Sequence, residues 1–138
     1  MKFEAIYPVS PAEVWEALTE PEAIGDWLMD NDFLPIVGHR FTFTTRPRPG
    51  FSGIVTCEVL AVEPERRLRY SWDTGPHRTT VTWDLEPYGS GTRLTLLHEG
   101  FRGAAGIIPQ IVLRNGWGSI LRKGLPRRLG IEPIKVSS

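Results

Sequence analysis

The stretch IIPQIVLRNGWGSILRKGLPRRL, Ile107 to Leu129, decides the fold, because it is the only segment long and periodic enough to form one long helix. At ~100° per residue, its apolar positions fall on one broad stripe, which consists of Ile107, Ile111, Trp117, Leu121, Leu125 and Leu129. A helix of roughly 20 residues is about 30 Å long, the width of a small domain. We therefore expect a single curved sheet to close around this helix and bury the stripe.

Three residues within the helix depart from this simple pattern. Gly116 and Gly118 flank Trp117, and a glycine costs a helix roughly 1 kcal/mol. They predict a close approach of other backbone, room left for another group, or a break in the helix. Arg114 falls on the apolar stripe, where a lone buried cation is costly. Three outcomes would avoid this cost: the side chain extends to solvent at the rim of the domain, pairs with an acid, or binds an anionic group of a ligand. Extension to the rim is the commonest outcome for so long a side chain.

Length and charge define the broad class of the protein. At 138 residues the chain forms one domain, residues 1–138, with room for a real core. Its formal net charge is zero, with 16 basic and 16 acidic residues, so no overall field favours nucleic acid or a membrane as a partner. The charges are nevertheless separated: Lys2 is the only base in residues 1–32, and Glu132 is the only acid in residues 102–138. Two solvated or touching faces explain this separation better than a partner site does.

Cysteine content and hydropathy predict the compartment. Cys57 is the only cysteine, so no intrachain disulfide can form, a reducing compartment fits, and we expect a buried thiol. The N-terminal MKFEAIYP has no apolar segment of the signal-peptide type, and no run of ~18 apolar residues occurs. We therefore expect a soluble, cytoplasmic protein.

The N-terminal third predicts one strand and two short helices. Residues 2–7 alternate, with Phe3, Ala5 and Tyr7 on one face. Two S/T-x-x-E capping boxes then predict helix starts, the first at Ser10 and Glu13 and the second at Thr19 and Glu22. The second helix ends near Trp27 and Leu28, and residues 29–37 read as a loop.

From Arg40 to Glu99 the period changes to two, and five strand-like runs follow one another with turn residues between them. Strands joined by short turns pair antiparallel, so these runs predict a meander. The positions expected on the inner face are Phe41, Phe43, Leu68, Tyr70, Trp72, Val81, Trp83, Leu85, Leu94, Leu96 and His98. The long helix is the obvious cover for this face. Residues 130–138 are expected to form a loose tail.

These segments together resemble the START-like, helix-grip superfamily (SRPBCC), and within it the group similar to the C-terminal domain of the Hsp90 ATPase activator. The resemblance rests on SPAEVWEALTEPEAIGDWL (10–28), VGHRFTF (37–43), EVLAVEPERRLRYSW (58–72), TTVTWDLEPYGSGTRLTLLHEGF (79–101) and GW (116–117). It implies an α+β helix-grip fold, in which a curved antiparallel sheet of about six strands wraps around the long C-terminal helix. The sequence departs most from the family pattern at Gly118, Gly124 and Pro126 in the last helix.

The resemblance also implies a cavity between sheet and helix that takes a hydrophobic or aromatic small molecule. The candidate lining residues are Phe41, Phe43, Tyr70, Trp72, Val81, Trp83, Leu96, His98, Arg114, Trp117 and Leu121. Simple core packing is the other interpretation of these aromatic residues, since aromatics dominate small cores. Arg114 and Trp117 are three residues apart on the helix, so we expect them to line one opening beside Gly118, with Arg114 near its mouth and Trp117 deeper.

Motifs for catalysis and metal binding are missing. We find no G-x-S-x-G, no cysteine beside a histidine, no phosphate loop and no histidine pair with metal spacing. A single histidine on an apolar strand face, such as His98, is more often a hydrogen-bonded core residue than a catalyst. The sequence therefore favours non-covalent binding of a small molecule without metal or cofactor. A cyclase- or aromatase-like enzyme and a co-chaperone-like module are the alternatives, both by analogy; direct Hsp90 activation is not expected, and a homodimer is left open.

Overall fold

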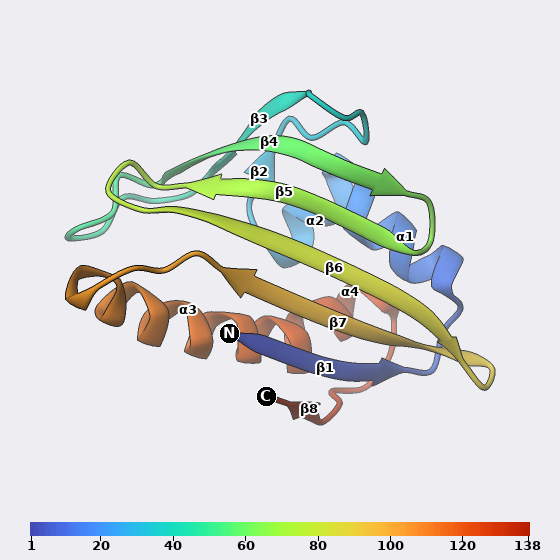
Figure 1. The fold of residues 1–138 in the computed structure, drawn as a ribbon. Helices are drawn as coiled ribbons and strands as arrows, with labels where there is room; N and C mark the ends of the chain where they lie inside the picture. The colour runs from blue at the N-terminus through green and yellow to red at the C-terminus, as the bar shows by residue number, and fades with distance from the viewer.

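The computed structural model describes the backbone of residues 1–138 and every side chain except that of Ala104. One sheet wraps around the C-terminal helix, and two short helices follow the first strand (Figure 1). The strands are β1 (Lys2–Tyr7), β2 (Asp30–Asn31), β3 (Arg40–Thr44), β4 (Ile54–Glu63), β5 (Arg67–Asp73), β6 (Arg78–Tyr88), β7 (Gly91–Glu99) and β8 (Val136–Ser137). The helices are α1 (Pro11–Thr19), α2 (Pro21–Trp27), α3 (Ile107–Ser119) and α4 (Leu125–Leu129), with a 3-10 turn at Ala104–Gly106 and a π-helical turn at Ile120–Gly124.

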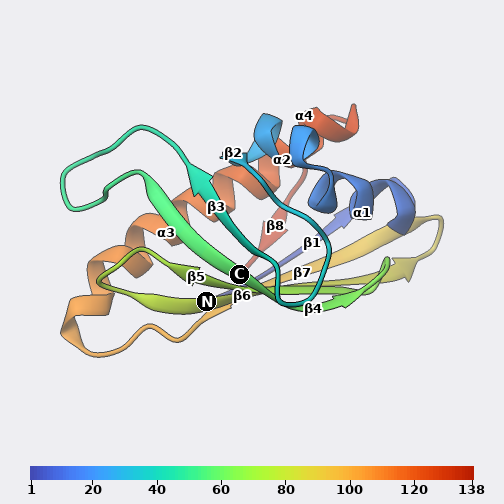
Figure 2. The same cartoon turned by 90° about the horizontal axis from the view of Figure 1, so that it is seen from above.

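The sheet is a continuous antiparallel meander from β3 to β7, as the sequence predicts. Its strand order is β2-β3-β4-β5-β6-β7-β1-β8, so β1 closes the sheet beside β7. The sheet has eight strands where about six are expected, because two-residue strands extend both edges. The expected loose tail is one of them: Val136 and Ser137 pair with Ala5 and Glu4. The helix-grip architecture itself is confirmed (Figures 1 and 2).

Period-two alternation places side chains on the inner face as predicted. Phe3, Ala5 and Tyr7 are buried on β1, and Val81, Trp83 and Leu85 are buried on β6. In the register, Trp83 lies opposite Leu96 on β7 and Val81 lies opposite His98. The sheet therefore presents one apolar face to the helices, because each strand contributes every second residue to it.

Both predicted short helices are present, α1 with the expected capping residue and α2 with a different one. The backbone N–H of Glu13 donates to Ser10 Oγ over 3.2 Å, which caps α1. Thr19 is the last residue of α1, and its hydroxyl donates to the Trp15 carbonyl over 2.7 Å instead of capping α2. Glu20 occupies the N-cap position of α2 without a side-chain hydrogen bond. Pro21 begins this helix by itself, since its fixed φ suits the first helical position.

The C-terminal helix is continuous through Gly116 and Gly118, and a π-helical turn carries it into Pro126. A backbone N–H at position 126 would donate to the Leu121 carbonyl in a π-helix and to the Arg122 carbonyl in an α-helix. Pro126 has no N–H, so both carbonyls need another donor. The Tyr7 hydroxyl donates to the Leu121 carbonyl (2.8 Å), and the Ile134 N–H donates to the Arg122 carbonyl (3.1 Å). The first strand and the C-terminal segment thus satisfy the carbonyls that Pro126 frees.

The predicted apolar stripe is buried only in its second half. Trp117, Leu121 and Leu125 are at most 2% exposed, whereas Ile107 and Ile111 are 55% and 56% exposed. The first turns of α3 lie beyond the end of β7 (Figure 1), so the sheet does not cover them. Helical periodicity identifies an apolar face but does not tell where the covering sheet ends.

Candidate functional site

Ten of the eleven predicted lining residues come together between the sheet and the C-terminal helix. Each is at most 3% exposed; they are Phe41, Phe43, Tyr70, Trp72, Val81, Trp83, Leu96, His98, Trp117 and Leu121. Strands β3, β5, β6 and β7 supply eight of them, and the helix supplies Trp117 and Leu121. The arrangement forms an aromatic wall, and the question for function is how much of it a ligand can reach.

Trp117 is the centre of this wall. Its ring lies 5.5 Å from the rings of both Trp72 and Trp83, centroid to centroid. Trp27 of α2 meets Trp83 edge to face at 5.7 Å, so two strands and two helices converge on these rings. Aromatic pairs at such distances are favourable beyond their buried area. Sequence reasoning missed Trp27 as part of the wall, although its place after an apolar helical stripe was a usable signal.

A chain of hydrogen bonds crosses the wall and fixes the state of His98. Trp117 Nε1–H donates to His98 Nδ1 (3.0 Å), so Nδ1 carries no proton and Nε2 does. His98 Nε2–H donates to Thr79 Oγ1 (2.7 Å), whose own proton goes to the Trp72 carbonyl (3.0 Å). Burial lowers the pKa of His98 to about 3, assisted by the nearby N-terminal charge. His98 is therefore a neutral, fully hydrogen-bonded core residue, the structural interpretation that the sequence favours.

Tyr70 and Cys57 are the other polar groups of the interior. Trp83 Nε1–H donates to the Tyr70 hydroxyl over 2.9 Å. Burial raises the pKa of Tyr70, against the effect of the hydrogen bond from Trp83. Burial also raises the pKa of the Cys57 thiol, and the carboxylates of Asp73 and Asp32 add to this shift. Both groups stay protonated at neutral pH, so the interior carries no charge.

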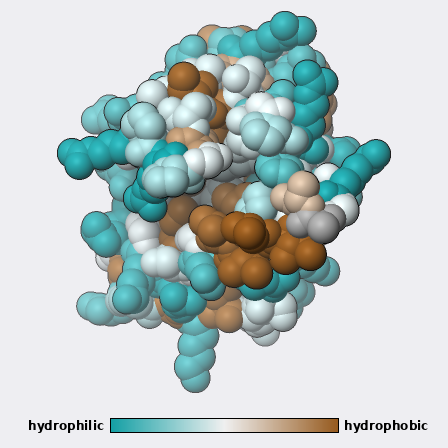
Figure 3. Space-filling model, turned by 90° about the vertical axis from the view of Figure 1, so that its left-hand side faces the viewer, coloured by the Kyte–Doolittle hydropathy of each residue, from teal (hydrophilic) through white to brown (hydrophobic). Residues whose placement is uncertain are grey.

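Every residue of the aromatic wall is buried, and a separate, exposed apolar surface lies at the start of α3. Figure 3 shows a hollow there, next to a cluster of hydrophobic side chains. Ile107, Ile108, Ile111 and Val112 are 55%, 73%, 56% and 63% exposed, and they are the largest group of exposed apolar residues close together in the described sequence. Phe101 is half-buried and its ring lies 4.8 Å from that of His98, which joins this surface to the wall.

Glycine leaves space on this side of the helix, at a position different from the expected one. A Cβ at Gly116 would meet no atom within 4 Å, whereas a Cβ at Gly118 would lie 3.2 Å from Nη1 of Arg122. Residues 108, 112 and 116 are spaced by four and so share one face of α3. The free space at Gly116 therefore continues the apolar surface of Ile108 and Val112.

Arg114 does not lie on the buried wall. Its side chain is exposed. The pKa of the Met1 amino group is lowered by the burial of that group and by the positive charge of Arg114, and the Glu99 carboxylate opposes this shift. Met1 donates to the His98 carbonyl over 2.7 Å, so Arg114 belongs to the β1 side of the helix. Trp117 is buried and Arg114 faces solvent near β1, so Arg114 does not line the interior with the other ten residues.

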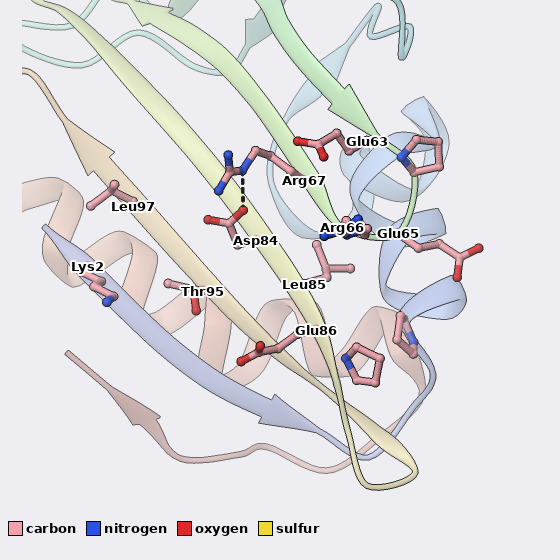
Figure 4. A pocket seen from close by; sticks show the side chains of 13 residues that line it. Lys2, Glu63, Glu65, Arg66, Arg67, Asp84, Leu85, Glu86, Thr95 and Leu97 are labelled. Carbon is pink, nitrogen blue, oxygen red and sulfur yellow. Dashed lines mark hydrogen bonds and ion pairs between the residues drawn. The ribbon is translucent and has the colours of Figure 1, made fainter.

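A second depression lies on the opposite, outer face of the sheet. It measures about 990 Å³ and is lined by residues of β4 to β7, β1 and the intervening turns (Figure 4). Acids and bases alternate across it, and Arg67 forms an ion pair with Asp84 at 2.7 Å. Such mixed, mutually neutralised charge is typical of a solvated sheet face, so the aromatic wall remains the stronger candidate.

No three His, Cys, Asp or Glu side chains lie together in a way that could hold a metal ion, within the part that the structure describes. Over the same residues, no helix is long and apolar enough to cross a membrane.

Comparisons with known proteins agree with the fold. The family model described as "Activator of Hsp90 ATPase homolog 1-like protein" matches residues 8–130. Protein MLL2253 from Mesorhizobium loti is 35% identical, with a TM-score of 0.86 over 94% of this chain and 96% of that one. Protein BH1534 from Bacillus halodurans is 27% identical, with a TM-score of 0.78 over 93% and 94% of the two chains.

A third solved structure shares the fold. DynU16, from the dynemicin biosynthetic locus, is 24% identical with a TM-score of 0.70, over 94% of this chain and 45% of DynU16. No curated protein matches the chain. The family match spans most of the residues, and the helix-grip fold and aromatic wall accompany it. The chain therefore belongs to the family of activator of Hsp90 ATPase homolog 1-like proteins.

Proposed function

We propose that the protein binds a hydrophobic or aromatic small molecule, without covalent chemistry, at the exposed apolar surface beside the aromatic wall. One observation supports the proposal: Ile107, Ile108, Ile111 and Val112 expose apolar surface at the start of α3, on a face of the molecule where hydrophobic side chains border a hollow (Figure 3). A cytoplasmic location fits the single, buried Cys57.

The first half of α3 is apolar on more than its packed side. Leu113 packs against the core, while Ile108 and Val112 project elsewhere and remain exposed. A helix that is apolar on most sides is normally covered on most sides. Covering such side chains gains roughly 25 cal/mol for each Å² removed from water. A ligand that fills the hollow supplies this missing cover.

The aromatic rings favour ligands that contain rings themselves. Phe101 lies beside Gly106 at the start of α3 and its ring contacts that of His98, which in turn contacts the rings of Trp72 and Trp117. Offset or edge-to-face contacts with these rings add to the hydrophobic gain. The space at Gly116 lets a flat molecule approach the helix backbone closely.

The chemistry of the interior supports binding over catalysis. A general base works best with a pKa near the operating pH. The pKa of His98 lies at about 3, and both ring nitrogens are engaged. Tyr70 and Cys57 have raised pKa values and stay protonated. This wall therefore serves better as a surface for apolar contact than as a source or acceptor of protons.

Titration with phenylnaphthylamine, a neutral dye that fluoresces in apolar surroundings, tests this function. The double variant Ile108→Ser/Val112→Ser should weaken dye binding roughly tenfold, since two aliphatic contacts are lost. The matched control is Ile36→Ser/Val37→Ser, because these residues are 59% and 62% exposed in the β2–β3 connection. Equal weakening by both doubles, or no dye binding to the wild type, would contradict the proposal. Native mass spectrometry of freshly purified protein would identify a bound compound directly.

A further inference from the structure

The loop between β3 and β4 is a hydrogen-bonded hairpin at the same end of the molecule as the start of α3 (Figures 1 and 2). Arg48 and Phe51 exchange two backbone hydrogen bonds of 2.9 and 2.8 Å, and the Thr45 N–H donates to the Gly53 carbonyl over 2.8 Å. Pro49 and Gly50 form the tip, where the positive φ of Gly50 (79°) suits the third position of a type II turn. Phe51 packs against the core and anchors this tip.

This hairpin carries two arginines that the fold does not use. Arg46 and Arg48 are exposed, and none of the ion pairs among the described residues involves them. Asp30 lies opposite Thr44 at the base of the hairpin and makes no ion pair with them either. Asp73, on the neighbouring β5, is engaged by Arg78 at 3.1 Å. The two guanidinium groups therefore remain available on a preformed support.

The interior of the wall has little left to offer a polar ligand group. His98, Thr79 and both indole N–H groups of Trp83 and Trp117 already bond to one another or to neighbouring groups. A charged group would lose its hydration there without gaining a counter-charge. A ligand with a charged group must keep it at the opening, where the hairpin stands.

We propose that the ligand is an amphiphilic anion, whose apolar rings or chain lie against α3 and whose carboxylate, sulfonate or phosphate binds Arg46 and Arg48. The inference rests on the proposed function, because it specifies the ligand of the same hollow. Arginine holds such anions through paired, charge-assisted hydrogen bonds. The zero net charge of the whole chain is no obstacle, because the two arginines act locally.

Two dyes that differ by one sulfonate separate this proposal from the proposed function. Anilinonaphthalene sulfonate has the rings of phenylnaphthylamine and one added anionic group. We expect Arg46→Gln/Arg48→Gln to weaken sulfonate binding roughly tenfold and to leave the neutral dye unchanged. The control Arg69→Gln/Arg127→Gln removes the same charge from two other exposed arginines, which form no ion pair in the described part of the chain.

Each outcome has one meaning. Selective loss of the sulfonate dye in the hairpin variant supports the anion site. Equal loss in both doubles shows general electrostatic attraction and overturns it. If the sulfonate dye binds the wild type and both double variants equally, and the neutral dye binds the wild type well, the anion site is overturned and the proposed function stands. If neither dye binds the wild type, both proposals fail. Circular dichroism of each variant confirms that the fold is intact before the comparison.

Discussion

At the scale of single residues, the side chains that matter most are polar groups whose partners come from distant parts of the chain. Tyr7 caps a helix carbonyl in the C-terminal region, and Trp117 fixes the tautomer of His98. Sequence patterns predict that Tyr7 and His98 face inward, and both are buried. The identity of their partners could not be predicted, because each bond depends on the final packing of the helix on the sheet.

Tyr7→Phe should lower the free energy of unfolding by about 1–3 kcal/mol, because the buried Leu121 carbonyl loses its donor. Chemical denaturation measures the loss. Tyr88→Phe is the matched control, since Tyr88 is 48% exposed and its hydroxyl makes no hydrogen bond among the described residues. A loss of equal size in both variants would refute the capping role of Tyr7.

His98 should stay neutral in the folded protein from pH 8 to about pH 5, because its pKa lies at about 3. The unfolded state binds a proton near the ordinary histidine pKa of about 6.5. The His98 contribution to stability is therefore complete above pH 6.5 and declines as the pH falls from 6.5 toward 3. Nitrogen-15 NMR of the imidazole checks this, and a titration step near pH 6.5 in the folded protein would contradict it.

At the scale of elements, the strands follow the sequence closely and the helices follow it less well. Alternation over five or more residues places β1, β3, β5, β6 and β7, since burial of one face is what produces such a pattern. The two-residue strands β2 and β8 carry too little pattern and depend on pairing with β3 and β1. The Thr19 capping box failed because Thr19 still belongs to α1, whose last turn its hydroxyl bonds.

Ser10→Ala should cost ~1 kcal/mol of stability, because the Glu13 N–H loses its acceptor. Thr19→Ala should leave the start of α2 unchanged, because Glu20 is the N-cap residue there. Amide hydrogen exchange in the first turn of each helix distinguishes the two sites. Faster amide exchange at the start of α2 in the Thr19 variant would show that Thr19 does cap this helix, and would contradict the structure.

Gly116→Ala should stabilise the protein by up to about 1 kcal/mol, because alanine favours the helix and its Cβ meets no atom within 4 Å. Thermal melts measure the change. Gly53→Ala is the contrasting variant: a Cβ there would lie 2.4 Å from the Thr45 carbonyl oxygen at a positive φ of 86°, so a marked loss is expected. Destabilisation by Gly116→Ala would mean that the space beside it is filled.

At the scale of the whole molecule, the sequence predicts the fold and the set of inward aromatic residues, and the structure adds an exposed apolar surface at the start of α3. The helix-grip arrangement follows from alternation on the strands and from the apolar helix. This exposed surface could not be predicted, because it depends on how far α3 extends beyond β7 (Figure 1). For the same reason Ile107 and Ile111 were expected in the core and instead border the hollow.

The central claim, that ligands bind at the exposed apolar surface beside the aromatic wall, is tested most directly by NMR mapping of phenylnaphthylamine binding. The five tryptophans give separate indole N–H signals. We predict shifts of the Trp117 indole signal and of the Ile108 and Ile111 methyl groups, with no change at Trp15. Shifts confined to residues around Arg67 and Asp84, in the depression on the outer face of the sheet (Figure 4), would contradict the claim.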